Sequence, residues 1–216
     1  MDSNDWAIIK RHLENAICRT VQQFQQHPAD FLSENDNQAV LFAELRNEMR
    51  DLRMKYEAAC PKDRCFGKPL DVSRVMSEYW IAAEGQCDIV VLCGEQDPEA
   101  AALWRHPCRI GIEIKLWQAL EPHNWNGPRG SQKDVEKLQR YWKHRDEKGQ
   151  PFTGIAMLFR RPGAFPCQEV VQMAGTDHEA AYPENGVAIH VISKDNHWCN
   201  TAAVLKLTAV TAQNTD

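Results

Sequence analysis

Residues 109–117, RIGIEIKLW, alternate between apolar and other side chains. Every second position from Ile110 to Leu116 is apolar, which is the period of a β-strand with one face in a core. The opposite face carries Glu113 and Lys115, and same-face neighbours on a strand stand about 7 Å apart. That spacing is too long for a tight ion pair by chance, but both side chains can reach one reacting group. The segment therefore predicts a sheet strand with a carboxylate and an amine on its polar face.

Residues 87–94, CDIVVLCG, are apolar on both faces, as expected for a central strand. Asp88 begins the apolar run, so a hairpin between the two strands would bring it close to Glu113. Two carboxylates at the edge of a buried sheet repel each other and lose hydration, so they require a compensating cation. A hard divalent ion such as Mg²⁺ prefers oxygen ligands, and it can generate hydroxide and polarise a phosphoryl group. Lys115 can then position or deprotonate the water, or stabilise a charged transition state.

A structural interpretation of the same charges is also open. In it, Asp88 ends a turn while Glu113 and Lys115 face solvent, as charged side chains on strands routinely do. The acid ahead of an apolar strand favours the metal site over this alternative.

Helical spacing of apolar residues and capping motifs predict the helices. The predicted helices run from Ser3 or Asn4 to about Gln26, from the SEND capping box at Ser33 to about Arg53, and onward from Ser131, which opens the SQKD capping box. The predicted strands are 72–82, 87–94, 109–117, 152–160, 186–192 and 202–210, with a polar turn at 193–200. Three consecutive strands predict a meander, and the helix between two strands predicts a βαβ crossover. The fold class is therefore α/β or α+β, with a central mixed sheet flanked by helices.

The composition indicates one globular domain spanning residues 1–216. The chain is 43% hydrophobic and 25% charged, with a net charge of −5, which argues weakly against nucleic acid binding. Metal-binding carboxylates would count as negative charge until filled, so a phosphate-rich substrate is not excluded. No apolar run approaches the roughly 20 residues that a membrane helix requires. The N-terminal segment is acidic and amphipathic, unlike a signal or transit peptide, so a cytoplasmic setting is expected.

The eight cysteines are then expected to be thiols rather than disulfides. Cys60 and Cys65 could form half of a zinc site, completed by the pair His106 and Cys108 or by His197 and Cys199. Free cysteines are more often small buried hydrophobes. The sequence has no P-loop, dinucleotide-binding glycine motif or nucleophile elbow.

The layout resembles the PD-(D/E)xK nuclease superfamily, which has the restriction-endonuclease-like fold. Its signature is an acid on one strand followed by E-x-K or D-x-K on the next, here Asp88 and residues 113–115. Many members also carry a glutamate on an earlier helix, and FLSENDNQAVLFAEL with Glu34 is similar to that element. The resemblance covers residues 31–160 in order and spacing. One departure is Cys87, which replaces the proline before the aspartate.

The resemblance implies an αβββαβ nuclease-like core at 31–160, with an additional N-terminal helix and a C-terminal β-rich extension at 166–216. It implies a metal-dependent phosphodiesterase in which Asp88, Glu113 and the backbone carbonyl of Ile114 ligate Mg²⁺ or Mn²⁺. Lys115 would orient or activate the attacking water, and Glu34 would hold a second ion or a metal-bound water. The implied partner is nucleic acid, with DNA favoured and a homodimer suited to cutting both strands. A binding module that has kept the acidic site without efficient turnover is the alternative.

Four further charged residues have competing explanations. Glu34 can instead make a favourable contact with the helix dipole, and Asp36 is best explained as the acid of the capping box. Glu78 is interpreted as structural or peripheral. Lys137 can reach a phosphate, although a solvated helix face explains it equally well.

Overall fold

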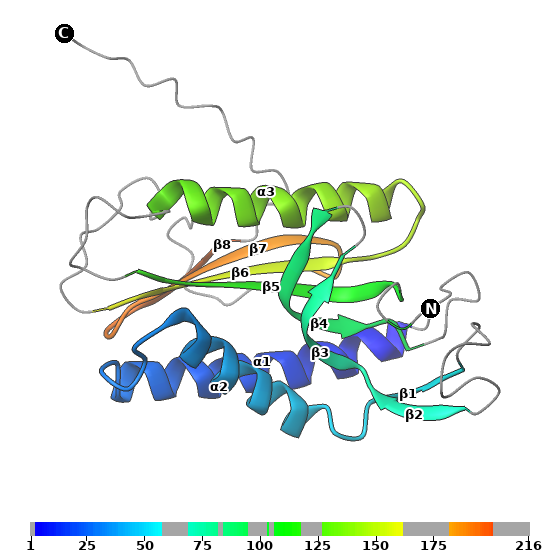
Figure 1. Ribbon diagram of the computed structural model, residues 1–216, viewed down its shortest axis with the longest axis horizontal. Coiled ribbons are helices and arrows are strands. Elements are labelled where there is room, and N and C mark those ends of the chain that lie inside the picture. The colour runs from blue at the N-terminus through cyan, green and yellow to red at the C-terminus, as the bar shows by residue number, and fades with distance from the viewer. Residues whose placement is uncertain are drawn as a thin grey trace, which may run out of the picture.

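A mixed sheet lies between two layers of helices in this mixed α+β protein (Figure 1). The computed structural model describes residues 3–57, 69–81, 84–94, 103, 106–117, 127–161 and 182–200. Its helices are α1 (Ser3–Gln26), α2 (Glu34–Glu48) and α3 (Gly127–Asp146). Its strands are β1 (Arg53–Tyr56), β2 (Leu70–Ser73), β3 (Val75–Trp80), β4 (Gln86–Leu92), β5 (Cys108–Trp117), β6 (Thr153–Arg160), β7 (Gly186–Ile192) and β8 (His197–Asn200). Among these helices, none has the length and apolarity needed to cross a membrane.

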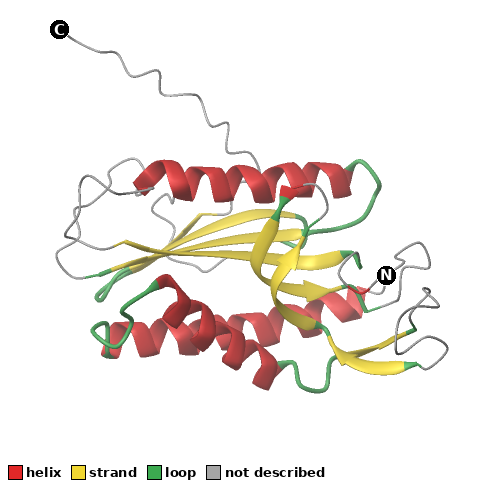
Figure 2. Ribbon diagram, viewed as in Figure 1, coloured by secondary structure: helices red, strands yellow, loops and turns green. Residues whose placement is uncertain are grey.

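The main sheet has the order β3-β4-β5-β6-β7-β8 within the described residues. Strands β3, β4 and β5 form an antiparallel meander, and β5, β6 and β7 run parallel. Helix α3 connects β5 to β6 and covers one face of the sheet, while α1 and α2 cover the other (Figure 2). The predicted meander and βαβ crossover are both confirmed.

The alternation along β5 separates two hydrophobic cores. Ile110, Ile112 and Ile114 pack with the core that includes residues of α1 and α2. The opposite face is closely packed: a Cβ atom on Gly111 would lie 2.9 Å from the ring of Phe152 and 3.3 Å from the Leu138 side chain of α3, and the first distance is closer than carbon atoms pack. This tight layer explains why a strand with a polar motif is nevertheless almost wholly buried.

The capping box at Ser33 is present as predicted. The Asp36 carboxylate accepts the backbone N–H of Ser33 at 2.7 Å, and the backbone N–H of Asp36 is 3.3 Å from the Ser33 hydroxyl. The predicted end of this helix near Arg53 is wrong, because α2 ends at Glu48 and Arg53 begins β1. Residues 53–56 alternate between exposed and buried side chains, so a two-residue period replaces the helical one there.

Two other predicted boundaries are corrected. The single strand predicted at 72–82 is divided at Arg74 into β2, which pairs with β1, and β3, which pairs with β4. The predicted start of a helix at Ser131 is also wrong, because α3 already begins at Gly127. Pro128 lies in its first turn, where a missing N–H removes no helical hydrogen bond.

The C-terminal strands extend the main sheet. The turn predicted at 193–200 is shorter than expected, since β8 occupies its second half and pairs antiparallel with β7. The turn itself is closed by the Ser193 N–H, which donates to the Asn196 carbonyl at 2.8 Å. The strand predicted at 202–210 lies outside the described residues.

A histidine pair, with His190 buried and His197 half-buried, joins β7 to β8 and should make the fold sensitive to acid. Nδ1 of His190 lies 2.9 Å from Nε2 of His197. Burial and, to a smaller extent, the neighbouring His197 lower the pKa of His190 from 6.5 to about 3. Because the folded state disfavours the proton, this stability is present above pH 6.5 and is lost as pH falls toward 3.

We expect His190→Gln to reduce the loss in the free energy of unfolding as the pH falls below 6.5. Over this window His190 alone contributes a slope of up to about 1.4 kcal/mol per pH unit. Urea unfolding between pH 7 and pH 4 measures the slope, with His27→Gln, at an exposed position on the turn after α1, as the matched control. Equal slopes for wild type and His190→Gln would contradict the prediction.

Candidate active site

Asp88 contacts the backbone of the E-x-K motif directly. Its Oδ2 accepts the backbone N–H of Ile114 at 2.7 Å. Backbone pairing between β4 and β5 begins one residue after Asp88, at Ile89 opposite Ile112. The Asp88 carboxylate therefore takes the position of a hydrogen-bond acceptor that a strand carbonyl would otherwise fill. An extended residue directs its N–H and C=O toward the same neighbouring strand. The Ile114 carbonyl therefore lies on the Asp88 side of β5.

Glu113 is buried beside a lysine from α3. The residue is only 3% exposed, and its Oε1 lies 2.6 Å from Nζ of Lys137. The same ammonium donates to the backbone carbonyl of Gln86 at 2.6 Å. Lys137 thus links α3 to both central strands, and its side chain is 14% exposed. The interpretation of Lys137 as part of a solvated helix face is wrong.

Lys115 connects three elements of the fold. Its Nζ donates to Oε1 of Glu34 at 2.9 Å, from the first residue of α2. It also lies 3.4 Å from Oδ2 of Asp134 on α3. Asp134 is in turn 3.9 Å from the ammonium of Lys137. The four predicted residues Glu34, Asp88, Glu113 and Lys115 are therefore brought into one network of charges.

The two strand carboxylates perturb each other. Burial and, to a smaller extent, the charge of Asp88 raise the pKa of Glu113 to about 8, although Lys137 lowers it. Burial likewise raises the pKa of Asp88 to about 6, against the hydrogen bond from Ile114 and the charge of Lys115, which lower it. Ionising both carboxylates therefore places two poorly solvated charges within electrostatic range of one another, which is the condition that a bound cation relieves.

Lys115 is held in its charged form. Burial lowers its pKa, but the hydrogen bond to Glu34 and the charges of Asp134 and Asp88 outweigh that effect, and the net pKa is raised. At neutral pH the side chain is therefore an ammonium that donates hydrogen bonds. Of the three roles that the sequence suggested, this arrangement suits orientation of the water and stabilisation of charge rather than deprotonation.

Several residues of the network were not singled out as site residues from the sequence. Gln38 of α2 donates to the Asp88 carbonyl at 3.0 Å and to the Glu78 carboxylate at 2.7 Å. Glu78 has a φ of 50°, a left-handed conformation that is uncommon for residues with a side chain. Asp134 and Lys137 alternate with the buried apolar stripe of α3, and their i, i+3 spacing is the one sequence signal that could have grouped them.

The oxygen donors fit a hard divalent ion. Asp88, Glu113 and the Ile114 carbonyl offer the ligand chemistry that Mg²⁺ or Mn²⁺ prefers, and burial with mutual repulsion gives the carboxylates a reason to bind one. In the part of the chain that the structure describes, no three His, Cys, Asp or Glu side chains are grouped to hold a metal. Cys60 and Cys65 lie outside that part, so the alternative zinc site stays a prediction.

Comparison with known proteins assigns no relative to this arrangement. No family model matches the chain, and no curated protein or solved structure matches it either. The class defined by the structure is thus a mixed α+β protein with a buried carboxylate and lysine network at the β4–β5 pair.

Proposed function

We propose that this protein is a divalent-metal-dependent nuclease that hydrolyses phosphodiester bonds, with DNA as the favoured substrate. One observation carries the proposal: the Asp88 carboxylate is hydrogen-bonded to the backbone between Glu113 and Lys115. The order of α2, the meander, α3 and β6 is consistent with a restriction-endonuclease-like core at 31–160, which belongs to the same proposal. A homodimer would suit cleavage of both strands of a duplex.

Each residue has a stated role in this proposal. Asp88, Glu113 and the Ile114 carbonyl hold the Mg²⁺ or Mn²⁺ ion, which when bound lowers the pKa of a water and offsets charge on the phosphoryl group. Lys115 donates to the attacking water or to a phosphate oxygen. Glu34 fixes the Lys115 ammonium through the 2.9 Å hydrogen bond, and holding a second ion or a metal-bound water stays a further proposed role for it.

A binding module without efficient turnover is the second candidate, and one contact favours it. Lys137 already places a positive charge 2.6 Å from the Glu113 carboxylate. A site neutralised by a lysine has less need of a metal ion. Such a protein would bind nucleic acid or another protein on the same fold.

A cleavage assay separates the two candidates. We expect the full chain to cut duplex DNA with Mg²⁺ or Mn²⁺ and to stop cutting when EDTA is added. Asp88→Asn should lose cleavage, because the amide lacks the charge that binds the ion, while Asp51→Asn, at an almost fully exposed site, should cut like wild type. Parallel reactions with single-stranded DNA and RNA define the substrate. Binding of nucleic acid without cleavage under every metal condition would reject the nuclease in favour of the module.

Metal binding should also be visible as a change in thermal stability. Mg²⁺ or Mn²⁺ should raise the melting temperature by mass action, since a ligand at 100 times its Kd stabilises a fold by about 2.7 kcal/mol. Asp88→Asn or Glu113→Gln should remove this response, because each takes away one of the two carboxylates that hold the ion. Differential scanning fluorimetry with and without metal measures both effects. An unchanged metal response in both variants would place the ion elsewhere.

A further inference from the structure

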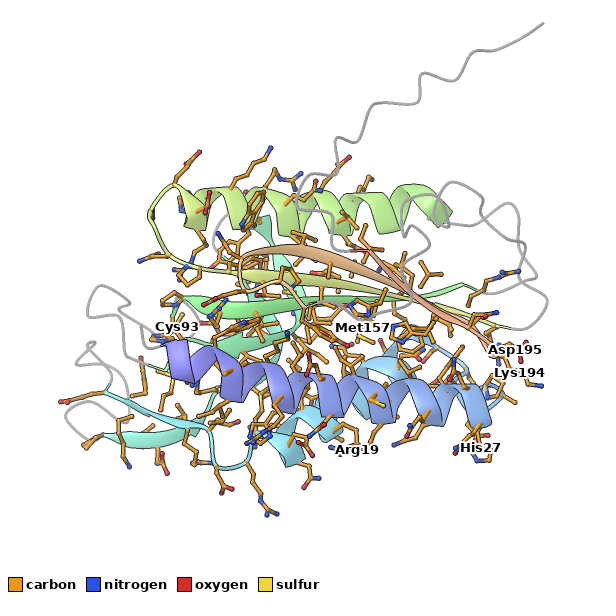
Figure 3. The ribbon with its side chains drawn as sticks, turned by 180° about the vertical axis from the view of Figure 1, so that it is seen from behind. Arg19, His27, Cys93, Met157, Lys194 and Asp195 are labelled. Atoms are coloured by element: carbon orange, nitrogen blue, oxygen red, sulfur yellow. The ribbon has the colours of Figure 1, made fainter. Side chains whose placement is uncertain are left out.

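Lys137 brings a positive charge to the two carboxylates of the proposed metal site. Figure 3 shows α3 along one face of the sheet and α1 along the other, and Lys137 reaches the strands from the α3 side. Its Nζ lies 2.6 Å from Oε1 of Glu113. Burial raises the pKa of Glu113 and of Asp88, and the charge of Lys137 lowers both. The ammonium is therefore placed to act as the counter-ion of this pair.

The contact with Glu113 supplies charge without a well-aligned hydrogen bond. Oε1 of Glu113 is buried and accepts no hydrogen bond of good geometry from the described residues, although the ammonium approaches to 2.6 Å. The hydrogen bond that Lys137 does donate goes to the backbone carbonyl of Gln86, also at 2.6 Å. A buried carboxylate oxygen without a hydrogen bond retains part of its desolvation cost. Glu113 can therefore still gain free energy from coordination to a divalent ion.

Asp134 offers the ammonium a second position on the same helix. Its Oδ1 lies 3.9 Å from Nζ of Lys137, at the i, i+3 spacing that brings helical side chains together. Oδ2 of Asp134 is buried without a hydrogen-bond partner among the described residues, although Nζ of Lys115 is 3.4 Å away. A rotation of the Lys137 side chain can thus exchange the contact with Glu113 for a shorter one with Asp134, and the backbone of α3 need not move.

We propose that Lys137 is the resident counter-ion of Glu113, and that its ammonium must move toward Asp134 before a divalent ion can coordinate Glu113. This inference rests on the metal site of the proposed function. Two cations on one carboxylate oxygen repel each other strongly in a poorly solvated site. The affinity for metal is then the difference between coordination by Glu113 and the ion pair that coordination replaces. Lys137 therefore determines how readily the carboxylates accept a metal ion.

Calorimetric titration of the full chain with manganese chloride, at constant ionic strength, tests this competition. Lys137→Met should bind Mn²⁺ about tenfold or more tightly than wild type, because no charged contact has to be broken first. Lys133→Met removes the same charge from an exposed position one turn earlier on α3, and it should bind Mn²⁺ like wild type. A purely structural role for Lys137 predicts equal or weaker binding by Lys137→Met.

A double-mutant cycle separates displacement of Lys137 from simple repulsion between its charge and the ion. Asp134→Asn removes the acceptor of the displaced ammonium. It should therefore weaken Mn²⁺ binding by about two- to tenfold more in the wild-type background than in the Lys137→Met background, because residues in contact show coupling of this size. Repulsion alone predicts the same change in both backgrounds.

A crystal structure of the wild-type protein with Mn²⁺ gives a measurement that depends on no variant. Nζ of Lys137 should lie nearer to Asp134 than to Glu113 when the ion is bound. An unchanged contact between Lys137 and Glu113 beside a bound ion would overturn the proposal, even if the variants fail to fold.

The outcomes also separate this inference from the nuclease activity. Binding of Mn²⁺ by Lys137→Met but not by wild type would support the displacement and favour the binding module over the nuclease. Equal Mn²⁺ affinity in wild type and Lys137→Met, or equal effects of Asp134→Asn in the two backgrounds, would overturn the inference and leave the nuclease proposal intact. Absence of Mn²⁺ binding in both proteins would reject the metal site and the inference together.

Discussion

Replacing Lys115 with alanine should slow single-turnover cleavage about 10²- to 10³-fold while the metal-induced rise in melting temperature remains. The ammonium is charged and fixed by Glu34 at 2.9 Å and Asp134 at 3.4 Å, so it is positioned before substrate arrives. Its proposed interactions are with the attacking water and with charge that develops during displacement. Interactions made only in the transition state change the rate, and loss of one such donor costs about 10²–10³ in rate.

Two further variants make this result specific. Lys115→Arg should restore little activity, because the planar guanidinium cannot occupy the same position as a compact ammonium. Lys55→Ala, which removes a largely exposed lysine on β1, should cut at the wild-type rate. Single-turnover cleavage and a binding titration on one oligonucleotide at fixed salt separate rate from affinity. Cleavage by Lys115→Ala at the wild-type rate would show that the lysine has no part in the chemistry.

The central strands could be predicted because their burial produces a simple pattern of apolar residues in the sequence. Ile110, Ile112 and Ile114 face one core, and that face alone imposes the two-residue period of β5. The position of Asp88 followed from the same information, since a hairpin between adjacent strands places it next to the motif. Here the local pattern and the tertiary structure agree.

The element boundaries that were predicted wrongly depend on which strand or side chain a segment contacts in the folded protein. In the sequence, Arg53–Tyr56 follows α2 with a similar pattern of polar residues. In the structure, its buried Met54 and Tyr56 belong to a strand that pairs with β2. Arg74 divides one apolar segment between two sheets because its guanidinium is bonded to Asp5 and to the Leu92 carbonyl. Neither partner is near in sequence, so no local period could reveal these contacts.

The network around the candidate site shows the same limit. Lys137 contacts Glu113 because α3 crosses β5 at that residue, and Gln38 contacts Asp88 because α2 begins beside it. Sequence reasoning finds chemistry on adjacent strands, where spacing fixes geometry. It does not find the residues that a packed helix adds, because the rotation and height of a helix are set by the core.

Glu113→Gln should change how the stability of the metal-free protein depends on pH. The pKa of Glu113 is raised from 4.5 to about 8 by burial and by Asp88. Because the folded state favours the protonated form, its contribution is complete below about pH 4.5 and is lost as pH rises through about 8. Asp88, whose pKa is raised from 3.8 to about 6, adds a loss of the same sign at lower pH. These two carboxylates should therefore remove stability from wild type in EDTA between pH 4.5 and pH 8.5, against the gain that His190 gives below pH 6.5.

The variant should lose less stability over this range, because its amide carries no charge to desolvate. Each unit by which the pKa is raised corresponds to about 1.4 kcal/mol. The unfolding free energies of wild type and variant, plotted against pH, should therefore diverge by a few kcal/mol between the ends of the range. Urea unfolding in EDTA measures the divergence. The readout is the slope rather than the absolute stability, because the substitution also changes the 2.6 Å contact between residue 113 and Lys137 at every pH. Glu14→Gln, which removes a surface carboxylate paired with Lys10, should follow wild type. Parallel curves for wild type and Glu113→Gln would mean that Lys137 already neutralises Glu113 fully, which would remove the electrostatic reason for a metal ion at this site.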